Sequence, residues 1–193
     1  MAWLVAGLGN PGDRYAGTRH NVGRMVADEL VRDAGGRPRK VRFLPAEAAE
    51  ILVGDERVWV VRSTRFMNES GPVYASLAKK HGVEPARLIA VHDELDIPAG
   101  TIRVKLGGGG AGHNGLRSLD RALGTADYLR VRVGIGRPPG RKDPADFVLE
   151  PIRARDDPGI AVLVSHATDA VRSLVADGLE RTQDRFNRTT PSV

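Results

Sequence analysis

Hydrophobic and polar positions switch between two periods along the chain, which predicts strands that alternate with helices. Apolar runs at 3–6 and 88–91 are typical of short buried strands. In 129–135, apolar residues alternate with Arg130 and Arg132, which predicts a strand with one polar face. The same reasoning predicts a hairpin of strands 48–53 and 57–62 and a further strand over 101–106. It also predicts helices over about 22–34, 70–81, 116–123 and 157–176.

The remaining segments are expected to be loops. These are 7–21, the glycine-rich stretch 107–112 and 136–144, and the residues after Arg181 are polar and expected to be frayed. Asp157 and Pro158 have the form of an N-cap and a first-turn proline for the last long helix. With no internal repeat or long linker, this order predicts one three-layer α/β/α domain over residues 1–193, with a mixed, mostly parallel twisted sheet.

Composition narrows the function classes. The 193 residues include no cysteine, which excludes disulfides, thiolate zinc sites and cysteine nucleophiles. Apolar runs fall well short of the roughly 20 residues that span a bilayer. The N-terminus reads as a strand rather than a cleavable leader, so we expect a cytoplasmic protein with no membrane partner.

The charge balance favours an acidic partner. Lys and Arg number 29 against 24 Asp and Glu, which gives a net charge of +5 and a pI near 10.0. The cations are clustered, for example within 37–42 and 137–142. Clustered cations bind polyanions because each neutralised phosphate releases counterions, so nucleic acid is a candidate partner.

Polar residues that a core does not require follow several predicted strands. His20 precedes the first helix on a polar stretch, and its imidazole can accept a proton near neutral pH. Asp93 follows a buried strand and could orient His20 through a hydrogen bond. Without a functional role, His20 would be a solvated or helix-capping histidine, and Asp93 would be an aspartate that begins a turn.

Three asparagines lie in separate loops near these two residues. Asn10, Asn68 and Asn114 offer neutral donors and acceptors that suit the positioning of a water or a carbonyl. Asn68 could equally cap the helix that follows it. His113, beside Asn114 in the glycine-rich loop, is a weaker candidate.

Other kinds of site fit poorly. Gly7, Gly9 and Gly12 have dinucleotide-site spacing, but no helix is predicted to open directly after them. The glycine-rich stretch lacks the lysine of a phosphate-binding P-loop, and neither a G-x-S-x-G nor an H-E-x-x-H motif occurs. We therefore expect no cofactor and no metal, and a base that activates water against a reactive carbonyl.

The chain resembles bacterial peptidyl-tRNA hydrolases in motifs that follow the family's order over roughly residues 2–149. These are Leu8-Gly9-Asn10-Pro11-Gly12, Tyr15, Thr18-Arg19-His20-Asn21, Phe66-Met67-Asn68-Glu69-Ser70-Gly71, His92-Asp93-Glu94-Leu95-Asp96, Gly112-His113-Asn114-Gly115-Leu116 and Gly134-Ile135-Gly136-Arg137-Pro138. The resemblance implies a monomeric α/β enzyme that hydrolyses the ester between a peptide and the 3′-terminal ribose of tRNA.

The resemblance also implies roles for individual residues. His20 would be the base, and Asp93 would stabilise its basic form. Asn68 and Asn114 would hold the carbonyl or the water, and Asn10 would contact the peptide. Tyr15 and Phe66 would line the path of the tRNA 3′ end and the peptide. Lys105 and Arg132 would bind the tRNA 5′ phosphate.

Two alternatives stay open at this point. One is a non-catalytic RNA-binding module on the same scaffold, which the presence of both His20 and Asp93 disfavours. The other is a nicotinamide-dependent oxidoreductase, which rests only on the spacing of the N-terminal glycines.

Overall fold

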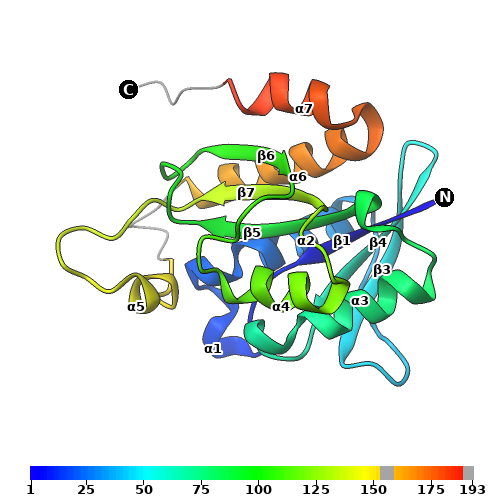
Figure 1. Ribbon diagram of the computed structural model, residues 1–193, viewed down its shortest axis with the longest axis horizontal. Coiled ribbons are helices and arrows are strands. Elements are labelled where there is room, and N and C mark those ends of the chain that lie inside the picture. Colours follow the sequence, from blue (N-terminus) through cyan, green and yellow to red (C-terminus); the bar gives the residue numbers. More distant parts are fainter. Residues whose placement is uncertain (153–158, 189–193) are drawn as a thin grey trace.

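The computed structural model describes residues 1–152 and 159–188, which build a seven-stranded mixed sheet with helices on both faces (Figure 1). The strands run in the order β2-β3-β4-β1-β5-β7-β6. Neighbours among the central strands β4, β1, β5 and β7 pair in parallel, and the pairs towards the two edges are antiparallel. The strands are β1 Ala2–Gly7, β2 Arg39–Lys40, β3 Ala46–Val53, β4 Glu56–Ser63, β5 Leu88–Glu94, β6 Ile102–Leu106 and β7 Leu129–Gly134. The predicted α/β class is confirmed.

The helices form the outer layers. Their bounds are α1 Asp13–Ala16, α2 Val22–Asp33, α3 Gly71–Lys80, α4 Asn114–Leu123, α5 Pro144–Val148, α6 Ile160–Asp177 and α7 Leu179–Phe186. Short 3-10 turns cover Arg19–Asn21, Met67–Glu69 and Pro85–Arg87. None of the helices among the described residues is long and apolar enough to cross a membrane.

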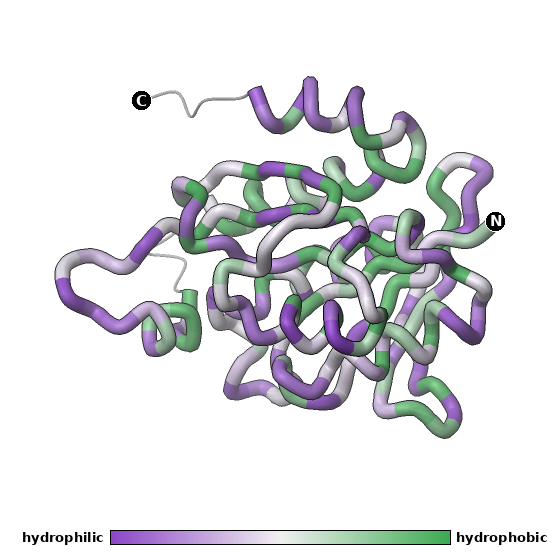
Figure 2. Tube along the Cα trace, in the orientation of Figure 1, coloured by the Kyte–Doolittle hydropathy of each residue, from purple (hydrophilic) through white to green (hydrophobic). Residues whose placement is uncertain are grey.

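Two separate cores explain the layers. The alternating side chains of the sheet point to both faces, so each face needs its own cover. α2 and α6 pack on one face, around residues such as Val5 and Val91. α3 and α4 pack on the other, around Leu4 and Ala90. The hydropathy colouring in Figure 2 follows this division, with the central strands largely green and the exposed part of α7 purple.

A close approach between α2 and β5 fixes the position of His20 relative to Asp93. A Cβ atom at Gly23 would lie 2.1 Å from the carbonyl oxygen of Val91. Only glycine therefore lets the first turn of α2 reach the strand. Because His20 lies two residues before α2 and Asp93 two residues beyond Val91, this contact brings the two side chains to the same place.

Several sequence-based boundaries were wrong. The expected loop 7–21 contains α1 and the 3-10 turn with His20, and α5 begins inside the expected loop 136–144. β5 continues through Glu94, so Asp93 lies within the strand rather than after it. α4 starts at Asn114, two residues earlier than expected. Short helical turns lack the repeated apolar spacing on which the prediction depended.

The C-terminal residues as far as 188 are not frayed. α7 packs along β6, and Asn187 donates to and accepts from the backbone of Val104, at 2.9 and 2.8 Å. The amide side chain thus pairs with the edge strand as another strand would. The predicted N-cap Asp157 and first-turn Pro158, and the last residues 189–193, lie outside the described residues.

Candidate active site

A cleft of about 830 Å³ opens at the carboxyl ends of β1 and β5, where parallel α/β sheets generally bind ligands. Four segments distant in sequence meet in its wall: the turn with His20, the 66–68 loop, the end of β5 and the start of α4. The residues predicted from the sequence that line it are Asn10, His20, Phe66, Asn68, Asp93, His113 and Asn114.

His20 and Asp93 form the centre of the cleft. Nδ1 of His20 lies 2.9 and 3.0 Å from the two carboxylate oxygens of Asp93. The carboxylate is nearly buried, with 3% of its side chain exposed, whereas 12% of the imidazole remains exposed. Since a carboxylate only accepts, Nδ1 carries the hydrogen and Nε2 keeps its lone pair. This is the tautomer that a general base needs.

His113 holds Asp93 from the other side. Its Nε2 lies 2.8 Å from Oδ1 of Asp93, and its Nδ1 accepts from the backbone N–H groups of Gly115 and Leu116 at 3.1 and 3.4 Å. The backbone donors leave no hydrogen on Nδ1, so Nε2 must donate to the carboxylate. A neutral His113 therefore satisfies both contacts and also caps α4.

The contact between His20 and Asp93 shifts the pKa values of both groups. Burial lowers the pKa of His20, but the charge and hydrogen bond of Asp93 outweigh it, and the net shift is upward from 6.5. Burial would raise the pKa of Asp93, but the two imidazoles lower it below its usual range. His92, buried behind this group, stays neutral because burial first and His113 second lower its pKa to about 3.

Asn10 is fixed in the floor of the cleft by hydrogen bonds. The side chain of Asn21, fully buried, accepts from the backbone nitrogen of Asn10 at 2.8 Å and donates to its carbonyl at 2.9 Å. Oδ1 of Asn10 accepts from the backbone nitrogen of Met67 at 2.8 Å. The carboxamide nitrogen of Asn10 is thereby oriented by a bond to the 66–68 loop.

The other predicted cleft residues differ in exposure. Asn68 and Asn114 are both exposed and line the cleft, where their amides can reach a ligand. Asn68 lies in a 3-10 turn and does not cap α3, whose N-cap position belongs to Ser70. Phe66, 52% exposed, meets the edge of Tyr15 with ring centroids 6.1 Å apart. Tyr15 thus supports the rim and is not among the residues that line the cleft.

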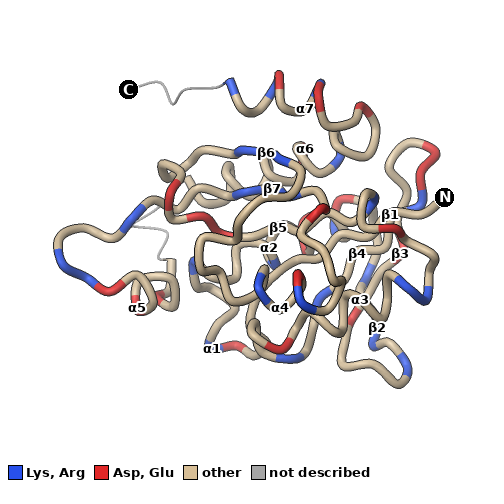
Figure 3. The backbone as a smooth tube through the Cα atoms, viewed as in Figure 1, with Lys and Arg blue, Asp and Glu red and all other residues tan. Residues whose placement is uncertain are grey.

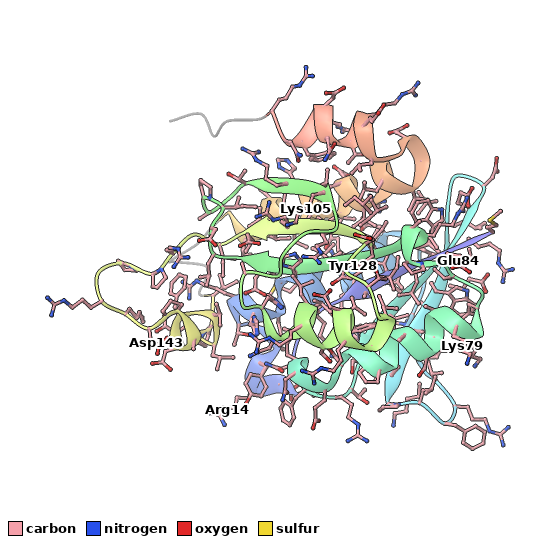
Figure 4. The ribbon with its side chains drawn as sticks, viewed as in Figure 1. Arg14, Lys79, Glu84, Lys105, Tyr128 and Asp143 are labelled. Atoms are coloured by element: carbon pink, nitrogen blue, oxygen red, sulfur yellow. The ribbon has the colours of Figure 1, made fainter. Side chains whose placement is uncertain are left out.

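Lys105 and Arg132 lie away from the cleft lining, on the antiparallel pair β6 and β7 (Figure 4). Nε of Arg132 lies 3.3 Å from Oε2 of Glu94, and Arg132 is one of the cations that lower the pKa of Lys105, after burial. Figure 3 shows cations on both strands. The two residues therefore form a cationic site separate from the amide-lined cleft.

Arg130 corrects the expected polar face of β7. The alternation with Arg132 predicted a shared polar face, but Arg130 is completely buried. The glycine-rich loop lies over it, since Nη1 of Arg130 donates to the carbonyl of Gly109 at 3.0 Å. A period of two predicts which residues share a face but not what covers that face.

One group of side chains, at the centre of the cleft, has the composition of a metal site. Within the described residues, His20, Asp93 and His113 form the group of acids and histidines whose ligand atoms, all within 4.8 Å of one another, could surround an ion. Those nitrogens already donate to Asp93, so a metal would have to displace both hydrogen bonds. The expectation of a metal-free site stays a prediction.

Sequence reasoning missed one residue that organises the site and gave another too little weight. Asn21 was quoted only as part of a motif, although its burial and double bond to Asn10 hold the floor of the cleft. A buried asparagine directly after His20 was the available signal, since such side chains bond to nearby backbone. His113 ranked as a weak candidate, yet it contacts Asp93 as closely as His20 does.

The fold and the cleft define a class of protein: an α/β domain with a mixed sheet in which a carboxylate-oriented imidazole faces a cleft lined by carboxamides. The chain belongs to the peptidyl-tRNA hydrolase family, whose model matches residues 4–192.

Individual relatives agree with this family. A peptidyl-tRNA hydrolase of Frankia alni is 52% identical, with 96% of this chain and 93% of that protein covered. The Mycobacteroides abscessus protein of the same name is 51% identical, with 96% and 95% covered. The crystal structure of peptidyl-tRNA hydrolase from Acinetobacter baumannii superposes with a TM-score of 0.90 at 29% identity, with 99% of this chain and 97% of that chain covered.

Proposed function

We propose that this protein hydrolyses the ester that joins a peptide to the 3′-terminal ribose of tRNA, with His20 as general base. The observation that carries the proposal is the His20–Asp93–His113 arrangement, which leaves Nε2 of His20 as the free acceptor beside carboxamides from separate loops. Family membership supplies the substrate class. The alternatives of a non-catalytic RNA-binding module and a nicotinamide enzyme find no comparable support.

The chemistry proceeds in two proton transfers. Nε2 of His20 takes a proton from water as the water oxygen adds to the ester carbonyl carbon, and Asp93 stabilises the imidazolium that results. Asn68 and Asn114 donate to the developing oxyanion or hold the water. The tetrahedral intermediate then expels the ribose oxygen, which takes the proton back from His20. Free peptide and tRNA are released.

The residues that recognise the tRNA and the peptide differ from the general base that carries out the hydrolysis. Lys105 and Arg132 clamp the 5′ phosphate, which suits two neighbouring cations on adjacent strands and imposes no sequence preference. Phe66, supported by Tyr15, offers a ring face to the 3′ end or the peptide. Asn10 contacts the first peptide carbonyl. A free α-amino group would place a cation where the site offers a carboxamide, which disfavours aminoacyl-tRNA.

The test is a comparison of two substrates. N-acetyl-aminoacyl-tRNA should release its N-acetyl amino acid, the free aminoacyl-tRNA should release little, and His20→Ala should abolish the release. Hydrolysis that survives in His20→Ala would refute the proposed base. Equal rates on the two substrates would refute the discrimination.

Three further expectations belong to this proposal. We take the chain as one catalytic domain over residues 1–193, acting as a monomer in the cytoplasm. Sedimentation of the protein alone would test the monomer, and fractionation of cells the location.

A further inference from the structure

Arg130 is a buried charge that the proposed chemistry does not use. Its side chain is the largest of those that are fully buried among the described residues. Burying a guanidinium is costly unless hydrogen bonds and an opposite charge compensate.

The partners of Arg130 lie on both sides of the pair His113 and Asn114 along the chain. Nη1 donates to the carbonyl of Gly109, in the loop that precedes the pair, at 3.0 Å. Nη2 lies 3.5 Å from a carboxylate oxygen of Asp120, in α4, which the pair opens. One guanidinium on β7 therefore fastens both segments that determine where His113 and Asn114 stand.

The loop depends on such contacts for its position. Gly107, Gly108 and Gly112 have positive φ angles, as does Ala111. Glycine adopts many backbone conformations with similar ease, so the glycines of this loop do not by themselves hold it in one shape. Its further ties are the hydrogen bond from the nitrogen of Gly107 to the carbonyl of Tyr128 and one from His113 to Gly110. Neither fixes the middle of the loop to the sheet.

The carbonyl of Gly109 is also the point where the cationic site touches the loop. Nζ of Lys105 lies 3.5 Å from the same oxygen that Arg130 binds. Lys105 and Arg130 are directly paired across β6 and β7. Figure 4 labels Lys105 beside β6 and β7. A phosphate bound by Lys105 would draw its ammonium away from Gly109, since a phosphate oxygen is the stronger acceptor.

We propose that Arg130 is a positioning residue that keeps the glycine-rich loop, and with it His113 and Asn114, in place when Lys105 turns to the tRNA 5′ phosphate. This inference rests on the proposed function. Lys105 and Arg130 both contact the carbonyl of Gly109. Lys105 can leave this carbonyl to bind phosphate because Arg130 still holds the loop.

The experiment uses one substrate in two forms, N-acetyl-aminoacyl-tRNA with its 5′ phosphate and the same tRNA after phosphatase treatment. In the unaltered protein, kcat should be the same for both forms, and the phosphate should lower only KM. In Arg130→Met, kcat with the phosphate should fall below kcat without it by about tenfold, the equivalent of one hydrogen bond from a charged donor.

Asp120→Asn is the second variant, because its side chain is partly exposed and the change leaves Arg130 in place. It should lower the same kcat ratio in the same direction by a smaller factor. Thr125→Ala is the matched control: it removes a 3.0 Å hydrogen bond from the backbone nitrogen of Asp127, between α4 and β7, but leaves the contacts of Arg130 with Gly109 and Asp120, so the ratio should stay at unity.

The outcomes are distinguishable. A general structural role would lower kcat equally for both forms of the substrate, and an unchanged ratio in Arg130→Met and Asp120→Asn would overturn the inference. If Arg130→Met fails to fold, the Asp120→Asn ratio alone decides. Failure of the proposed function would instead appear as absent hydrolysis by the unaltered protein.

Discussion

The cleft around His20 and Asp93 and the β6–β7 edge both contain ionisable groups, but they arrange them in opposite ways. In the cleft, one buried carboxylate satisfies two imidazoles through fixed hydrogen bonds. At the edge, Lys105 and Arg132 are partly exposed, and the pKa of Lys105 is lowered first by partial burial and then by repulsion from Arg132. The cleft depends on the exact position of its side chains, whereas the edge depends on its positive charge. Substitutions that move atoms should therefore affect activity through the cleft, and changes in salt should affect binding at the edge.

The largest effect should come from Asp93→Asn. The carboxylate accepts from both His20 and His113, whereas an amide has a single oxygen and adds donors of its own. One imidazole must lose its acceptor or change tautomer. We expect kcat to fall about 10²–10⁴-fold, the usual range of general-base catalysis. Single-turnover hydrolysis of N-acetyl-aminoacyl-tRNA measures it.

The control for this change is Asp55→Asn, on the exposed β3–β4 turn, which should leave kcat unaltered. If Asp93→Asn retained more than half of the activity, the orienting role of the carboxylate would be refuted, and the cleft would no longer differ from the edge in its dependence on position.

A purely geometric change should have the next largest effect. Gly23→Ala places a methyl group 2.1 Å from the carbonyl oxygen of Val91, so α2 must move away from β5. Overpacking of this kind costs about 1–3 kcal/mol of stability. Displacement of His20 by about 1 Å should lower kcat about 10²-fold. Urea unfolding and single-turnover rates would measure the two.

Gly35→Ala, in the open turn after α2, provides the control for backbone effects, since no atom lies near its Cβ position although its φ is positive. It should cost stability with little effect on kcat. Equal losses of kcat in the two variants would show that the α2–β5 contact does not position His20.

The pH profile should show the raised pKa of His20 directly. Only the neutral imidazole can take a proton, so kcat/KM should rise with pH and level off above a midpoint higher than 6.5. Below that midpoint the rate should fall about tenfold per pH unit. Removing the carboxylate in Asp93→Asn should move the midpoint down, because burial alone lowers the pKa. An upward movement would contradict the assigned cause.

Much of the fold and the cleft was predictable from the sequence for a simple reason. Strong periodicities predicted the main strands and helices. Asp93 and the residues before α2 were expected to meet because ligand-binding residues of parallel sheets gather at one edge. The distance between His20 and Asp93 was not predictable, since it depends on the close approach at Gly23.

Arg130 shows where sequence reasoning ended. The alternating pattern placed it correctly beside Arg132 but implied solvent, and the structure covers it with the glycine-rich loop. The tail failed for the same reason: the polar residues of α7 looked frayed, yet Gln183 and Asn187 bond to the edge strand β6. Both errors concern contacts between distant segments, which local patterns do not encode.

The smallest effects should appear at the cationic edge, in Lys105→Ala and Arg132→Ala. Each change should raise KM severalfold and reduce the slope of log KM against log salt by about 1, because one fewer phosphate contact releases one fewer counterion. Arg132→Ala should leave kcat nearly unchanged, since Arg132 is not among the residues that line the cleft, although its partner Glu94 is. Arg188→Ala, an exposed cation paired with Asp184, should alter neither slope nor KM. If all three variants gave the same slope as the unaltered protein, the edge would not bind phosphate, and the contrast between a positional cleft and an electrostatic edge would fail.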